Sequence, residues 1–376
     1  MIGLDRAAIW VELEVDADLV TIGIRKTFPG INPKRLSGNT QTYSINKKNI
    51  NEIRIKEKKW TTMIKIDFSY SRFEKDSNIE PMCDEVKKII IEEKIIKIIH
   101  DITLQDVKRD KLYFEYFEYC IQEKVKSFYA FHNIFSCFYR ALSRNINSSK
   151  EQIQFNGYDV KRDFFYSTGF IFQINKGWKI RLYSKTHENN KKNTEKIKGA
   201  SIRLEHRFTK TMIKNLCGTN QVSYLTLDIL KEKINKVVGK ILFETMIKEI
   251  YRDIDILKDK FKDFNSREIK SSIKDYQEHI LDEKIISNII TELSNKSERQ
   301  NKRYRLKIKE SLQELQARGS PVRDNFQNIE RLNFFINNIL MIKLKVKCSY
   351  KSGLTFIYKQ KGQKHVPFLK ENIFLI

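Results

Sequence analysis

Residues 169–183 read GFIFQINKGWKIRLY. Two runs rich in aromatic and β-branched side chains, Gly169 to Ile174 and Trp178 to Tyr183, flank the turn residues Asn175-Lys176-Gly177. Runs of this kind joined by a short turn with Asn and Gly predict a β-hairpin. Alternation along the second run predicts an apolar face with Trp178, Ile180 and Leu182, and a polar face with Lys179, Arg181 and Tyr183.

The same alternation predicts further strands. Residues 200–208 place Ile202, Leu204 and Phe208 on one face and Arg203, Glu205 and Arg207 on the other. If this strand and the strand 178–183 are neighbours, Tyr183 and Glu205 share a face. Further strands are expected at 9–14, at 61–70 with Asp67 on the polar face, and at 107–116 with Asp110 among cations.

Helical spacing of apolar residues predicts an amphipathic helix at 84–99, a buried helix at 128–142, and helices at 227–251 and 297–318. Asn265 with Glu268 resembles a capping box, and 343–347 alternates as a strand. Breakers predict loops at 29–59 and 186–199. We therefore expect an α+β protein: an antiparallel-sheet, nuclease-like domain at 1–218 and a mainly helical, basic domain at 219–376.

Charge indicates the partner. The chain has 71 Lys and Arg against 47 Asp and Glu, a formal net charge of +24. A field of this sign attracts polyanions, which favours nucleic acid over a merely Lys-rich surface. No apolar run is long enough to span a bilayer, the start lacks a secretory pattern, and the five cysteines are widely spaced. These features predict a cytoplasmic protein with no membrane partner and no disulfide framework.

Motifs narrow the chemistry. The chain has no phosphate-loop motif, no H-E-x-x-H and no G-x-S-x-G, which leaves carboxylates, tyrosines and lysines as candidate catalytic groups. Asp67, Asp110 and Glu205 each lie among cations on a polar strand face. Each is either half of a structural ion pair or, where two or three converge, a ligand of a divalent cation such as Mg²⁺ or Mn²⁺. Tyr183 is either a packing residue or a nucleophile toward phosphate.

Four segments in this order resemble the gene II type replication initiators of filamentous phages and related small plasmids. They are residues 69–78, with Ser69-Tyr70-Ser71-Arg72; Lys108-Arg109-Asp110; Arg181-Leu182-Tyr183-Ser184-Lys185 followed by Glu188; and Arg203-Leu204-Glu205. Two departures exist: the family's Gly-His is Asp76-Ser77 here, and the helix expected at 209–216 contains no tyrosine. The next tyrosine, Tyr224, is therefore a second candidate nucleophile.

The resemblance implies a site-specific DNA strand transferase that nicks a replication origin and starts rolling-circle replication. A tyrosine would join the 5′ phosphate and release a 3′-OH primer, with Mg²⁺ or Mn²⁺ as cofactor. It further implies Asp110 and Glu205 as metal ligands, with Asp67 as a third candidate, Tyr183 as nucleophile and Lys185 as a phosphate contact. The DNA would be bound as duplex and as single strand, and a host helicase and polymerase would complete replication.

Basic side chains supply the expected DNA contacts: Arg181, Arg203 and Arg207 on the strands, and Lys302, Arg303 and Arg305 on the helix 297–318. The latter helix is equally well explained as a solvated one. Two other functions stay open. One is a non-catalytic origin-binding protein. The other is an RNA-binding protein of a mobile element, which would expose sheet aromatics such as Tyr166, Phe170 and Phe172 for base stacking.

Overall fold

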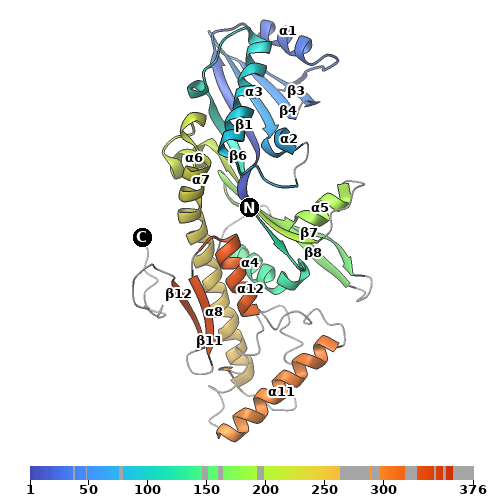
Figure 1. The fold of residues 1–376 in the computed structure, drawn as a ribbon, viewed down its shortest axis with the longest axis vertical. Helices are drawn as coiled ribbons and strands as arrows, with labels where there is room; N and C mark the ends of the chain where they lie inside the picture. The colour runs from blue at the N-terminus through green and yellow to red at the C-terminus, as the bar shows by residue number, and fades with distance from the viewer. Residues whose placement is uncertain are drawn as a thin grey trace. The chain divides into compact units, whose positions relative to one another are not determined.

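The protein was studied as a computed structural model (Figure 1). The structure describes residues 1–36, 39–47, 49–75, 79–145, 151–159, 164–192, 199–262, 288–289, 297–317, 328–342, 344–349 and 353–358. The chain forms two compact units, each built from two segments: Met1–Lys124 with Ile171–Lys236, and Val125–Phe170 with Val237–Ile376. The expected boundary at residue 218 lies inside the first unit, which continues to Lys236.

An antiparallel sheet forms the first unit. Its strands lie in the order β2-β3-β4-β5-β1-β6-β10-β9-β8. Their bounds are β1 Ile2–Leu13, β2 Lys34–Leu36, β3 Thr40–Lys47, β4 Ile50–Glu57, β5 Thr62–Ser69, β6 Tyr113–Val125, β8 Phe164–Asn175, β9 Trp178–Ser184 and β10 Ala200–Thr209. The α+β fold class and the antiparallel sheet are thus confirmed.

Helices cover the apolar face of this sheet. Helices α1 (Ala17–Thr27) and α3 (Glu85–Thr103) lie side by side, with α2 (Tyr70–Lys75) against α3 and β1 (Figure 1). Asp16 and Asp84 begin the two long helices by accepting hydrogen bonds from first-turn backbone N–H groups. The helices bury their apolar stripes against the sheet, because alternate strand residues on that face are apolar.

The predicted hairpin is confirmed. Strands β8 and β9 meet at a turn over Lys176 and Gly177, where the Asn175 side chain accepts a hydrogen bond from the Gly177 N–H at 2.8 Å. Strands β9 and β10 are neighbours, with Leu204 opposite Leu182 and Phe208 opposite Trp178. The strands 178–183 and 200–208 are therefore neighbours, which is the condition under which Tyr183 and Glu205 were expected to share a face.

Three local expectations are wrong. Within residues 29–59 the described strands β2, β3 and β4 form a meander rather than a loop, because Pro29, Gly30 and Pro33 precede β2 and the strands bury Tyr43, Ile45, Ile53 and Ile55. Residues 185–192 form helix α5 (Lys185–Lys192). Residues 109–111 form a 3₁₀ turn before β6, because Arg109 is drawn to the buried Glu92 on α3, 2.6 Å away.

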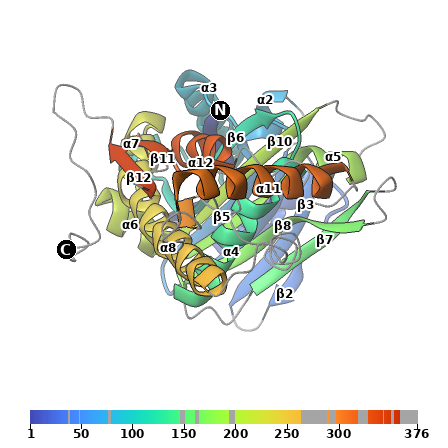
Figure 2. The same ribbon diagram turned by 90° about the horizontal axis from the view of Figure 1, so that it is seen from below.

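Further helices complete the two units. The first unit also contains α6 (Lys210–Cys217), ended by Gly218 in the left-handed region, a 3₁₀ turn at Val222–Tyr224, and α7 (Leu227–Ile234). In the second unit α4 (His132–Asn145) packs against α8 (Lys240–Lys262), joined by ion pairs from Arg140 and Arg144 to Glu249 (Figure 2). A π-helical turn at Asn235–Gly239 connects α7 and α8.

The rest of the second unit follows in short elements. They are β7 (Glu151–Asp159), α11 (Glu298–Ala317), α12 (Asn328–Phe334), a π-helical turn (Phe335–Ile339) and the hairpin β11 (Leu344–Ser349) with β12 (Gly353–Tyr358). The expected helix 297–318 and the strand at 343–347 agree with α11 and β11, whereas Asn265 and Glu268 lie outside the described residues. Among the described helices, no stretch is long and apolar enough to cross a membrane.

Candidate active site

Polar and charged side chains gather on the sheet face opposite α1 and α3. Strand β6 lies between β1 and β10 at the centre of this face. Asp5 comes from β1, Glu118 and Cys120 from β6, and Glu205 from β10. Three strands far apart in the sequence thus bring acidic groups together.

A β-bulge positions Asp5. Leu4 lies opposite Tyr119 and Ala7 lies opposite Phe117, so that Asp5 and Arg6 together oppose the single residue Glu118. A bulge of this kind turns an extra side chain toward one face, and bulges are common beside active sites. Strict alternation would place Asp5 with Ala7 and Ile9 on the apolar face, and for this reason sequence reasoning did not identify this residue.

Asp5, Cys120 and Glu205 form a potential metal-ligand group. Their ligand atoms all lie within 4.8 Å of one another, and the three residues are buried. Burial raises the pKa of the Cys120 thiol, with the charge of Glu205 adding to it. Cys120 is therefore a protonated thiol, and the two carboxylates are the effective ligands.

Arg203 holds the two carboxylates together. Its guanidinium is fully buried, donates to Asp5 at 3.0 Å and lies 3.5 Å from Glu205 Oε1. It also donates to the Gln122 side chain at 2.6 Å and to the Ile79 carbonyl at 2.5 Å. This arginine is therefore a structural centre of the site rather than a surface cation.

The Ile79 segment reaches the site because of Gly3. Leu4 and Met82 exchange backbone hydrogen bonds of 2.9 and 2.8 Å beside it. A Cβ at Gly3 would lie 2.0 Å from the Met82 carbonyl oxygen, so only glycine permits this approach. The resulting bridge brings the segment that includes Ile79 over the start of β1, where Arg203 binds its carbonyl.

Tyr183 contacts Glu205 directly. The Tyr183 hydroxyl donates a hydrogen bond to Glu205 Oε1, and only 2 % of the tyrosine is exposed. In the sheet Tyr183 lies opposite Arg203, and Glu205 lies opposite Arg181, so all four side chains share one face. Burial, followed by the charge of Glu205, raises the pKa of the Tyr183 phenol well above its ordinary value. The phenol therefore needs a base before it can act as a nucleophile.

Two cations flank the Tyr183 ring. The Arg181 guanidinium lies 4.0 Å from the ring centroid and 3.7 Å from Glu205 Oε2. Lys185 Nζ lies 5.8 Å from the same centroid, at the first residue of α5. Glu188 binds both cations, Arg181 at 3.0 Å and Lys185 at 2.8 Å. The Tyr-x-Lys and later Glu residues of the sequence thus form one compact group.

Glu118 lies beside this group. Burial raises its pKa to about 8, and the charges of Glu205 and Asp5 contribute further, so Glu118 is mostly protonated at neutral pH. Burial and Asp5 also raise the pKa of Glu205, which Arg203 and Arg181 counteract. Arg207, whose side chain is 41 % exposed, lies 3.6 Å from Glu118 on the solvent side.

Asp67 lies in a separate ion cluster on the same face. Arg6 donates to it through two nitrogens at 2.8 and 3.0 Å, Asn51 donates at 2.9 Å, and the Tyr116 hydroxyl donates to Oδ2. A carboxylate has about four lone-pair positions, and these donors use them. Asp67 therefore ties β4, β5, β1 and β6 together and is not part of the potential metal-ligand group.

The structure does not bring Asp110 or Tyr224 into this cluster. Asp110 is exposed in the 3₁₀ turn at Arg109–Lys111, where its backbone carbonyl accepts a hydrogen bond from the Gln221 side chain. Tyr224 ends the turn Val222–Tyr224 and is 63 % exposed. Of the residues proposed as metal ligands from the sequence, Glu205 alone belongs to the potential ligand group of the described chain.

The other residues expected to contact nucleic acid lie in different parts of the chain. Lys302 and Arg303 are exposed on α11 in the second unit, and Arg305 is partly exposed there. Phe170 and Phe172 are buried, and Phe170 packs on Phe138 and Tyr139. These two rings are core residues and are not available for base stacking.

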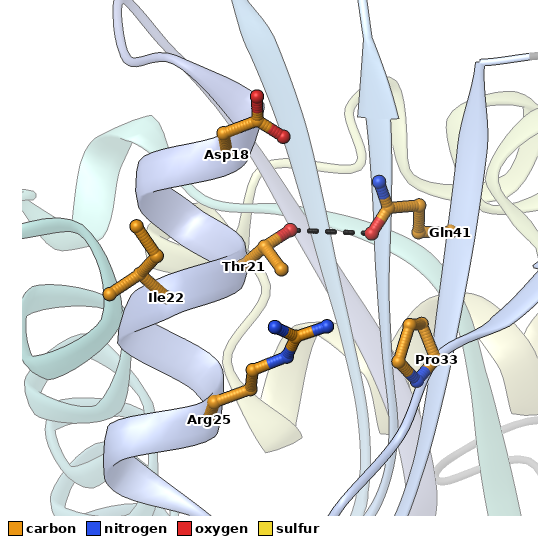
Figure 3. Close-up of a pocket in the computed structure, with 6 residues that line it drawn as sticks. All are labelled: Asp18, Thr21, Ile22, Arg25, Pro33 and Gln41. Carbon is orange, nitrogen blue, oxygen red and sulfur yellow. Dashed lines mark hydrogen bonds between the residues drawn. The ribbon is translucent and has the colours of Figure 1, made fainter.

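A groove of about 420 Å³ lies elsewhere in the first unit, along α1 and the edge of the sheet (Figure 3). Asp18, Thr21 and Arg25 line it from the helix, with Pro33 and Gln41 on the other side. Thr21 and Gln41 are bound to each other, and Tyr43 donates to both at 3.0 and 2.6 Å. The groove contains none of the predicted site residues.

The two carboxylates suit a hard divalent cation. Oxygen ligands bind Mg²⁺ and Mn²⁺, which keep several water or phosphate oxygens in their coordination shell, whereas a protonated thiol is a poor ligand for them. Asp5 and Glu205 approach each other from β1 and β10, beside Tyr183. The Tyr183 phenol and the guanidinium groups of Arg181 and Arg203 lie against these carboxylates.

Comparisons with known proteins give limited information. No protein-family model matches the chain, and no curated protein matches its sequence. Among solved structures, a rolling circle replication initiator protein from Geobacillus stearothermophilus is similar over 64 % of this chain and 83 % of that one, with a TM-score of 0.34 and 9 % identity. The di-domain ARO/CYC proteins BexL and StfQ each give a TM-score of 0.19, at 6 % and 9 % identity. BexL covers 65 % of this chain and 97 % of its own, and StfQ covers 64 % and 96 %. Scores this low do not establish a shared fold or function.

Proposed function

We propose that the protein initiates rolling-circle replication by nicking one strand of origin DNA, with Tyr183 as nucleophile and Asp5 and Glu205 as ligands of Mg²⁺ or Mn²⁺. The observation that carries this proposal is the hydrogen bond from the Tyr183 hydroxyl to Glu205, beside the second carboxylate Asp5. Tyr183 and Glu205 belong to segments that resemble the initiators, and they meet on neighbouring strands.

The proposed step is a transesterification. The Tyr183 oxygen attacks the phosphorus, and the phenolic proton passes along the existing hydrogen bond to Glu205. The new bond joins the tyrosine oxygen to the 5′ phosphate, and the bond from phosphorus to the 3′ oxygen breaks. The leaving 3′ oxygen takes a proton from water and becomes the primer end. Arg181, which is partly exposed, faces the developing negative charge.

A bound divalent cation would supply charge stabilisation at the phosphate oxygens. Asp5 and Glu205 would hold it, since their oxygens come together on β1 and β10. Lys185, paired with Glu188 beside the Tyr183 ring, positions the tyrosine and contributes positive charge on that side. The chain has no ATP-binding loop motif, which agrees with a host helicase and polymerase as later partners.

The decisive experiment compares two tyrosine variants. The purified protein is incubated with Mn²⁺ and supercoiled DNA that contains the intergenic region adjoining its gene. Relaxation to open circles and a covalent protein–DNA adduct on a denaturing gel are the readouts. We expect both from the wild type, neither from Tyr183→Phe, and both from Tyr224→Phe, which matches it in chemistry but is exposed away from the cluster.

Each other outcome has a meaning. An adduct that persists in Tyr183→Phe and disappears in Tyr224→Phe would transfer the nucleophile to Tyr224. Nicking that persists in Asp5→Asn and in Glu205→Gln would reject the proposed metal ligands. Tight origin binding without a nick in Mg²⁺ or Mn²⁺ would reject the enzymatic function altogether.

A non-catalytic origin-binding protein is the second candidate. The buried Arg203 is already paired with both Asp5 and Glu205, as expected of a structural ion cluster. In that case the polar face would only bind DNA, and divalent cations would leave the stability of the protein unchanged. The cation titration described in the Discussion separates these two functions.

Helix α11 provides a possible second DNA contact. Its exposed cations Arg299, Lys302, Arg303, Lys307 and Lys309 lie within three turns. Contacts of this kind go to phosphates, position the duplex and carry no sequence information. We assign α11 this role in the proposed function.

A further inference from the structure

A second feature of the polar sheet face is a row of four side chains across four strands. Arg54 on β4 lies opposite Lys65 on β5, Lys65 lies opposite Trp10 on β1, and Trp10 lies opposite Tyr113 on β6. Directly opposite residues project from the same face of a sheet. The sheet thus presents two cations followed by two aromatic rings in one line.

The two rings form a flat, accessible pair. The Trp10 and Tyr113 centroids are 4.9 Å apart and the planes are inclined by 25°, and both side chains are partly exposed. The Trp10 indole N–H is buried and has no hydrogen-bond partner in the described part of the chain, so it is not part of the accessible surface. The partly exposed rings themselves give the pair the properties of a binding surface.

The cations beside the rings are only partly neutralised. Arg54, whose side chain is 38 % exposed, pairs with Glu52 at 2.8 Å. Lys65 has no ion-pair partner among the described residues, and its Nζ lies 5.8 Å from the Tyr116 ring centroid. A polyanion laid along this row would therefore meet a free ammonium next to two stacked rings.

The row is continuous with the candidate active site. Two residues before Trp10 on β1, Ala8 lies opposite Asp67 on one side and opposite Tyr116 on the other. Its small side chain leaves room for the hydrogen bond from the Tyr116 hydroxyl to Asp67. Arg207 then stacks 3.8 Å over the Tyr116 ring and pairs with Glu118. A chain of aromatic and cationic groups thus leads from Trp10 to the carboxylates beside Tyr183.

We propose that Arg54, Lys65, Trp10 and Tyr113, termed the stacking row, seat unpaired bases and phosphates of single-stranded DNA beside the cleavage site. Stacking on aromatic rings with backbone phosphates on cations is the usual mode of single-strand binding, and it tolerates any sequence. The statement that the bound strand is DNA rests on the proposed function, whereas the statement that the row binds a single strand does not. Bases stacked here hold the strand open on the sheet face that carries Tyr183.

Binding and nicking are measured separately to test the row. Fluorescence anisotropy of a labelled thymidine oligonucleotide gives the dissociation constant in EDTA, where no nicking occurs. We expect Trp10→Ala and Tyr113→Ala each to weaken binding about tenfold, since one stacked base contributes about that factor. Trp10→Phe retains a ring and should restore most of the affinity. The matched control is Trp60→Ala, because Trp60 is 79 % exposed in the turn between β4 and β5.

The outcomes are distinguishable from those of the nicking assay. Unchanged affinity in Trp10→Ala and Tyr113→Ala, or an equal loss in Trp60→Ala, would refute the stacking row even if Tyr183 is the nucleophile. Weakened binding with no nick in the wild type would retain the row and reject the enzymatic function. Tighter binding of the matching RNA than of the DNA would overturn the assignment to DNA. Thermal melts of each variant exclude loss of the fold as the cause.

Discussion

Removal of Arg203 is the most direct test of the ion cluster. Arg203→Met keeps an unbranched side chain and removes the guanidinium group with its charge, so that Asp5 loses its 3.0 Å partner while it stays buried. Breaking one side of a buried pair costs about 3–5 kcal/mol, because the remaining charge is uncompensated. Domains are stable by only about 5–15 kcal/mol. We therefore expect a drop in melting temperature of about 6–20 °C in EDTA.

A double-mutant cycle assigns this cost to the correct partner. In the Asp5→Asn background the uncompensated charge is already absent, so Arg203→Met should cost about 1–3 kcal/mol less than in the wild type. Arg207→Met is the matched control on the same strand and face. Its side chain is 41 % exposed and its pair with Glu118 is 3.6 Å long, so it should cost less than about 1 kcal/mol.

Urea unfolding followed by circular dichroism measures all four corners of the cycle. The reasoning fails if Arg203→Met and Asp5→Asn are additive within about 0.5 kcal/mol, since residues in contact must couple. It also fails if Arg207→Met destabilises the protein as much as Arg203→Met. Either result would mean that the buried guanidinium does not neutralise Asp5.

Three further predictions concern the proposed metal ligands, the buried His206 and the helix α11. Mn²⁺ at 100 times its dissociation constant should stabilise the wild type by about 2.7 kcal/mol, and Asp5→Asn should abolish this gain in a thermal melt; equal stabilisation of the variant would exclude Asp5 as a ligand. Burial lowers the pKa of His206 to about 3. The folded form therefore resists protonation of His206. The stability that the neutral imidazole contributes is fully present above the pKa of His in the unfolded chain, about 6.5, and is lost as the pH falls below it. At pH 5 the loss of stability is about 2 kcal/mol. His206→Gln retains an acceptor for Trp178, so its free energy of unfolding should fall by about 2 kcal/mol less than that of the wild type between pH 7 and pH 5. Identical pH profiles of the two proteins would contradict the assignment of this loss to His206. Finally, Lys302→Gln with Arg303→Gln should lower the slope of log affinity against log salt by about 2 for duplex DNA if both contact phosphate, and an unaltered slope would make α11 a solvated helix.

Sequence reasoning succeeded where local chemistry determines local structure. The turn at Lys176-Gly177 and the alternation at 178–183 and 200–208 predict the hairpin and the shared face, and the contact from Tyr183 to Glu205 follows from them. Each feature depends on nearest neighbours along the chain or on one strand pairing. Such features need no knowledge of the distant parts of the chain.

Asp5 and Asp110 show where such reasoning ends. The bulge between Leu4 and Ala7 depends on pairing with β6, more than 100 residues later, and it reverses the face on which Asp5 lies. Asp110 follows Arg109, whose bond to Glu92 on α3 replaces the expected strand by a turn. Both outcomes were decided by tertiary contacts, to which local periodicity is blind.

The ion pairs on the polar face limit the net charge that the acidic cluster contributes to the attraction of a charged ligand. Asp67 is paired with Arg6 and Asp5 with Arg203, so these pairs contribute little net charge. The excess of +24 therefore resides largely elsewhere in the sequence. In the proposed function, long-range attraction of DNA then depends on groups outside the acidic cluster, and substitutions within the cluster should leave the salt dependence of binding unchanged.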